Sequence, residues 1–91
     1  MTINENVDPM PLLKSLFCAL LSKKGFLKKE DYEFRLGYKV INKMVSLLVP
    51  ELNWEIGEKG NEEPMLFGIK VHVDFVNPWN VQLYQDITRE V

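Results

Sequence analysis

A chain of 91 residues can form one domain and is too short for two, and a hydrophobic fraction of 46% excludes a disordered chain. Its single cysteine excludes an internal disulfide framework. The net charge of −2 is divided, because residues 1–50 hold eight Lys and Arg against five Asp and Glu, whereas residues 51–91 hold three against eight. This asymmetry can orient a partner protein or a second copy of the chain, but it is weak support for nucleic-acid binding, which needs a clustered basic face.

The first elements along the chain are a flexible segment and a helix. Residues 1–8 are polar and lack the positive charge of a signal peptide, so we expect a flexible N-terminus followed by a single domain over residues 9–91. Asp8 and Pro9 are typical of a helix start. An apolar stripe follows at helical spacing, and it ends at the Lys23-Lys24-Gly25 signal. The residues of the stripe are Leu12, Leu13, Leu16, Phe17, Leu20 and Leu21.

The residues of this predicted helix also bear on where in the cell the protein is expected. The uncharged run Ser15–Ser22 is far shorter than the roughly 20 residues of a membrane span, so no membrane association is expected. Cys18 lies in an apolar run and is expected to be a buried thiol. A lone reduced thiol without a secretion signal favours a cytoplasmic location.

A second helix is predicted from Lys28 or Lys29 to about Val49, where Pro50 ends it. Its apolar residues recur mainly at a spacing of four, and Gly37 is expected to let the two helices approach closely. The short link Phe26-Leu27 predicts an antiparallel helix hairpin. The residues of this second stripe are Tyr32, Leu36, Val40, Met44 and Leu47.

After Pro50 the apolar period changes from 3.6 to 2, which indicates strands. A short strand is expected at Trp54–Ile56, a long one at Met65–Phe75 and a third from Val81 to about Ile87. The Asn77–Asn80 turn is expected to join the last two strands as an antiparallel hairpin. The predicted fold class is therefore α+β, with an N-terminal antiparallel helix hairpin packed on a three-stranded antiparallel sheet, in the order ααβββ.

Candidate partner-binding residues lie on the predicted outer face of this sheet and in its turn. Even-numbered residues of the long strand are expected to face away from the helices, because side chains alternate along a strand. An aromatic or leucine side chain on such a face indicates cover by a partner or another subunit, and a tryptophan in a turn can anchor an interface. The candidates are Leu66, His72, Asn77, Trp79 and Tyr84.

Two other groups of residues could each have more than one role. Lys23, Lys24, Lys28 and Lys29 surround the predicted helix turn and could contact nucleic acid, although solvation of the helix ends explains them more simply. The side chains of His72 and Asp74 project from the same face of the predicted strand and could form an acid–base pair or a ligand site. One histidine and one cysteine do not supply the usual ligands of a structural zinc site, so no metal is expected. No motif for phosphate, dinucleotide or nucleophilic chemistry is present, and no cofactor is expected.

The run Leu66–Asp74, followed by Asn77-Pro78, resembles the terminal hairpin of small uncharacterised phage and prophage accessory proteins, with Lys70 in place of their usual proline. The resemblance implies a short protein of a mobile element, located in the host cytoplasm, that inhibits a host defence or transcription complex. The leading hypothesis is thus a non-enzymatic protein-binding module. The alternatives are a nucleic-acid-associated protein, and an oligomeric ligand-binding protein or small enzyme around His72 and Asp74. A homo-oligomer is compatible with each.

Overall fold

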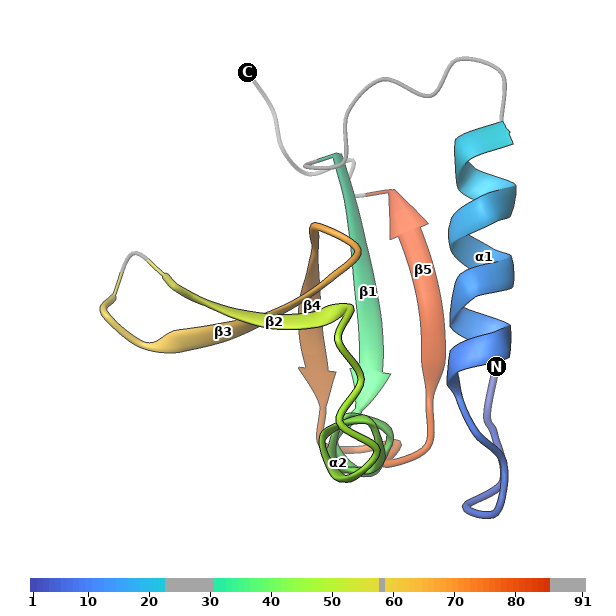
Figure 1. The fold of residues 1–91 in the computed structure, drawn as a ribbon. Helices are drawn as coiled ribbons and strands as arrows, with labels where there is room; N and C mark the ends of the chain where they lie inside the picture. Colours follow the sequence, from blue (N-terminus) through green and yellow to red (C-terminus); the bar gives the residue numbers. More distant parts are fainter. Residues whose placement is uncertain (23–30, 58, 86–91) are drawn as a thin grey trace.

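The computed structural model describes residues 1–22, 31–57 and 59–85. The elements of this part are α1 (Met10–Ser22), β1 (Tyr32–Gly37), α2 (Tyr38–Ser46), β2 (Leu52–Ile56), β3 (Glu62–Leu66), β4 (Ile69–Asp74) and β5 (Val81–Gln85). The strands form one mixed sheet in the order β2-β3-β4-β1-β5 (Figure 1). β1 lies inside the sheet, parallel to β4 and antiparallel to β5.

The first predicted helix is present as α1. Asp8 caps it, because its Oδ1 accepts the Met10 N–H at 3.0 Å. Leu13 and Leu20 are buried in the core. The expectation of a buried Cys18 is wrong, since the thiol is exposed. Five positions separate Cys18 from Leu13, which is about 140° around a helix of 3.6 residues per turn.

The second predicted helix is wrong over its first part. Residues Tyr32–Gly37 form β1, and only Tyr38–Ser46 form α2. A spacing of four is also a multiple of two, so Tyr32 and Leu36 fit a helix stripe and a strand face equally well. The strand alternation continues through Phe34, which is fully buried. The helices are therefore separated by a strand and do not form the expected hairpin.

The long predicted strand Met65–Phe75 is interrupted by a tight turn. Phe67 and Gly68 both have positive φ, of 54° and 78°, as in the two-residue turns that close antiparallel hairpins. The turn pairs Leu66 with Ile69 and directs both side chains to the core. The expected alternation is correct from Ile69 to Val73, but not before the turn.

The last two strands are not neighbours, contrary to the predicted hairpin. β4 and β5 flank β1, and the segment between them passes over the end of β1 at Gly37. A β-carbon at Gly37 would overlap the carbonyl oxygen of Pro78. Since the described residues form a sheet of five strands with a parallel pair, the predicted ααβββ fold with a three-stranded antiparallel sheet is wrong.

The core lies on one face of the sheet. Phe34 of β1 lies between Val71 of β4 and Leu83 of β5 in the strand register. Side chains of both helices join this cluster, so α1 and α2 pack on the same face. Neither helix of the described part has the length and apolar character needed to cross a membrane. The largest fully buried side chains include Leu13, Phe34, Leu36, Val40, Met44, Leu66, Ile69 and Val81.

The first residues of the chain lie against the sheet. Thr2 forms a bridge with Asn80, and the Val81 N–H donates to the Met1 carbonyl at 2.7 Å. The Ile3 N–H donates to the Trp79 carbonyl at 3.0 Å. The start of β5 is therefore covered by the segment that the sequence predicts as a flexible N-terminus.

Candidate protein-binding site

The face of β4, β1 and β5 that points away from the helices carries polar side chains. In the strand register, Glu33 of β1 lies between Lys70 and Tyr84, and Arg35 of β1 lies between His72 and Gln82. These two rows follow from alternation along each strand, because the positions between them are buried in the core or half-buried against it. We call the surface formed by Glu33, Arg35, Lys70, His72, Gln82 and Tyr84 the open face.

The open face combines charges with hydrogen-bonding groups. The Tyr84 hydroxyl donates to Glu33 Oε2 at 2.7 Å across the two strands. Arg35 and Lys70 supply cations, and both side chains are exposed. A surface of this kind can recognise the polar groups of another surface.

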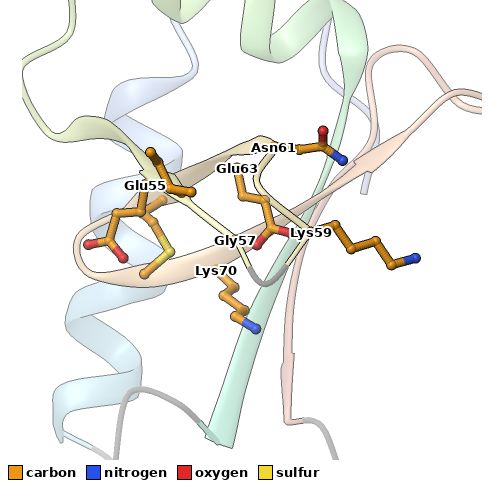
Figure 2. A pocket seen from close by; sticks show the side chains of 8 residues that line it. Glu55, Gly57, Lys59, Asn61, Glu63 and Lys70 are labelled. Carbon is orange, nitrogen blue, oxygen red and sulfur yellow. The ribbon is translucent and has the colours of Figure 1, made fainter.

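A hollow of about 580 Å³ continues the polar surface onto the β2–β3 hairpin (Figure 2). Its lining includes Glu55, Lys59, Glu63 and Lys70, with Met65 as the neighbour of Lys70 on β3. The Glu63 carboxylate lies beside Gly57 in Figure 2. Because most of the lining residues are polar and exposed, the hollow fits side chains of a partner better than an apolar small molecule.

Asp74 holds the segment that follows β4. Its Oδ1 accepts the N–H groups of Val76 and Asn77, each at 2.9 Å, and its Oδ2 accepts Asn80 Nδ2 at 3.2 Å. The Asn77 N–H is the main reason why the pKa of Asp74 lies below its usual value, with the Val76 N–H as a further contribution. Asp74 therefore stabilises the turn, and the contacts of its carboxylate do not include His72.

The structure separates the candidate residues predicted from the sequence. His72 and Tyr84 lie on the open face. Asn77 is exposed in the turn. Trp79 is half-buried against the core, so it is not a projecting anchor. The expected outer-face position of Leu66 is wrong, because the Phe67-Gly68 turn directs this side chain into the core, where it is fully buried.

Two further expectations concern nucleic acid and metal ions. Lys23, Lys24, Lys28 and Lys29 lie outside the described residues, so the nucleic-acid hypothesis stays a prediction. Within residues 1–22, 31–57 and 59–85, no group of three or more His, Cys, Asp or Glu side chains could hold a metal ion.

Glu33 and Arg35 are central to the open face and are missing from the candidates predicted from the sequence. The predicted second helix includes both residues, and on a helix they would lie among solvated positions. The alternation of Tyr32, Phe34 and Leu36 with these two charged residues is the signal that could have located them.

Comparisons of the chain with models of protein families, with curated proteins and with solved structures gave no match.

Proposed function

We propose that this chain is a non-enzymatic protein-binding module that contacts a partner protein through the open face. The observation that carries the proposal is the one-sided packing of the sheet. Both described helices pack on one face of β4, β1 and β5, and the side chains of the other face are exposed or half-buried. Three hydrogen-bonded strands hold the side chains of this face in fixed positions. Binding through it therefore does not require the free-energy cost of ordering a loop.

The chemistry of the open face supports a protein partner. Arg and Tyr, which are enriched at the energetically important positions of interfaces, lie there beside carboxylate and amide groups. The narrower hypothesis of a phage-encoded inhibitor draws only on the resemblance of Leu66–Asp74 and remains a proposal.

The test compares two charge reversals at exposed cations. Arg35→Glu changes the open face, whereas Lys39→Glu makes the same change on α2, outside the open face. Proteins from the cells in which the chain occurs are captured on each variant, and the partner retained by the wild type is purified for calorimetric titration. We expect Arg35→Glu to weaken binding about tenfold or more and Lys39→Glu to leave it unchanged.

Equal affinities of the wild type and Arg35→Glu for the purified partner would contradict the proposal. A larger loss with Lys39→Glu than with Arg35→Glu would also contradict it, because that result would place the contact on the helix side of the molecule.

A further inference from the structure

β4 has one edge bonded to β1 and a second edge that is partly open. The Gly37 N–H donates to the Asn80 carbonyl at 2.9 Å, so the main-chain groups of Gly37 point toward β5. Alternation along β1 then directs the groups of Phe34 and Leu36 toward β4. In the parallel register, Phe34 and Leu36 form their main-chain hydrogen bonds with Lys70, His72 and Asp74. The main-chain groups of Val71 and Val73 therefore point away from β1.

On that second edge, Pro64 ends the ladder of main-chain hydrogen bonds between β3 and β4. β3 and β4 pair only at Met65↔Lys70 and Leu66↔Ile69. Pro64 comes next, opposite Val71, and its carbonyl can accept the Val71 N–H, but proline has no N–H to return. The β2–β3 hairpin projects away from β4 beyond this point (Figure 1). A hollow of about 190 Å³ lies in the gap, and its lining includes Glu63, Pro64 and His72.

Three main-chain groups are consequently without a ladder partner in the described part of the chain. They are the carbonyl of Val71 and both the N–H and the carbonyl of Val73. The opposite edge of the sheet differs, because the Val81 N–H of β5 donates to Met1. Unpaired strand edges are templates for pairing with another strand.

The open edge of β4 is complementary to itself. If a second β4 approaches antiparallel, with a two-fold axis at Val73, the N–H and carbonyl of Val73 meet those of Val73 in the second copy. The pairing is confined to Val73 and its two neighbours, because Pro64 already lies opposite Val71 on this edge.

The same axis places a hydrogen-bond donor opposite an acceptor on the open-face side. His72 lies opposite Asp74 of the second copy, and the symmetry makes this pair twice. Asp74 is ionised, since its carboxylate accepts two main-chain N–H groups, and the His72 imidazole can donate a hydrogen bond to it. Side-chain pairs that hydrogen-bond directly across two strands stabilise the pairing.

We propose that two copies of this chain pair antiparallel through the open edge of β4 to form a homodimer. The two sheets then continue into each other through the β4 strands. The proposal goes beyond the binding of a partner protein, because the dimer forms through main-chain groups at the edge of β4, although His72 belongs to both surfaces. Either one can be correct without the other.

The test uses sedimentation equilibrium of the full chain with two variants at one exposed residue. His72→Glu places a carboxylate opposite Asp74 of the second copy, and His72→Lys keeps a hydrogen-bond donor there. We expect a wild-type dimer, an increase of the dissociation constant of about tenfold with His72→Glu, and a change within about threefold with His72→Lys.

Pro64→Val provides a second, independent test. Valine restores an N–H opposite the Val71 carbonyl and lets β3 continue along β4, which closes the edge. We expect this variant to be monomeric with the far-ultraviolet circular dichroism spectrum of the wild type. A wild type that stays monomeric up to about 1 mM would overturn the proposal. A wild-type dimer that neither His72→Glu nor Pro64→Val weakens would also overturn it.

Discussion

At the scale of single residues, Gly37 determines how two strands can lie on either side of β1. The carbonyl oxygens of Asn77 and Pro78 occupy the space where a side chain at this position would lie. The close approach lets the Lys39 N–H donate to the Pro78 carbonyl at 3.1 Å. The segment from β4 to β5 can therefore follow this path only because Gly37, at the end of β1, has no side chain.

Gly37→Ala is expected to destabilise the protein by about 1–3 kcal/mol, because the added methyl group must displace backbone atoms of the crossing segment. Gly57→Ala is the matched control. Its methyl group would meet the carboxyl end of the Glu63 side chain, which can rotate away, so the cost is within about 0.5 kcal/mol. Urea unfolding followed by tryptophan fluorescence measures both values. Equal destabilisation by the two substitutions would show that the segment does not pack on Gly37.

At the scale of elements, the segment between β4 and β5 depends on Asp74. Its folded-state pKa lies below the ordinary value of 3.8, so the unfolded chain binds this proton more readily than the folded protein does. The stabilisation is complete above the ordinary pKa of the unfolded chain. It is lost as the pH falls from 3.8 through the lowered pKa.

Asp74→Asn tests this contribution. We expect the variant to be less stable than the wild type at pH 7, and the difference to shrink as the pH falls below 3.8. The midpoints of urea unfolding at a series of pH values measure the difference. A stability difference that stays constant from pH 7 to the lowest pH would mean that the Asp74 charge does not hold the turn.

Prediction from the sequence was correct for elements that carry a local signal. The Asp8 cap and the apolar stripe located α1, and alternation located β2 and β5. β1 was missed because a spacing of four satisfies both periodicities, and only the intervening Phe34 favours a strand. The Phe67-Gly68 turn was missed because an apolar aromatic residue at positive φ is uncommon, so the long run looked continuous.

At the scale of the whole molecule, strand neighbours could not be predicted from local patterns. The pairs Glu33↔Lys70 and Glu33↔Tyr84 join residues far apart in the sequence. Periodicity indicates which face of a strand is apolar, but it says nothing about which strand lies beside it. For this reason the sequence predicted His72 and Tyr84 as candidate residues but did not predict the charged residues of β1 between them.

The open face exists only because β1 lies between β4 and β5. If Tyr32–Gly37 were helical, Glu33 and Arg35 would leave the sheet, and the partner-binding surface would lose its central row. The open edge of β4 depends on the same strand, since bonding to β1 determines that the Val73 groups point outward. Both proposals therefore rest on the position of β1.

Nuclear magnetic resonance of the isotope-labelled protein tests this position most directly. The structure predicts strand-type Cα and Cβ shifts over Tyr32–Gly37, and nuclear Overhauser effects from Phe34 to both Val71 and Leu83. Helix-type shifts that continue without interruption from Tyr32 into Ser46, with no contact between Phe34 and either residue, would contradict the account.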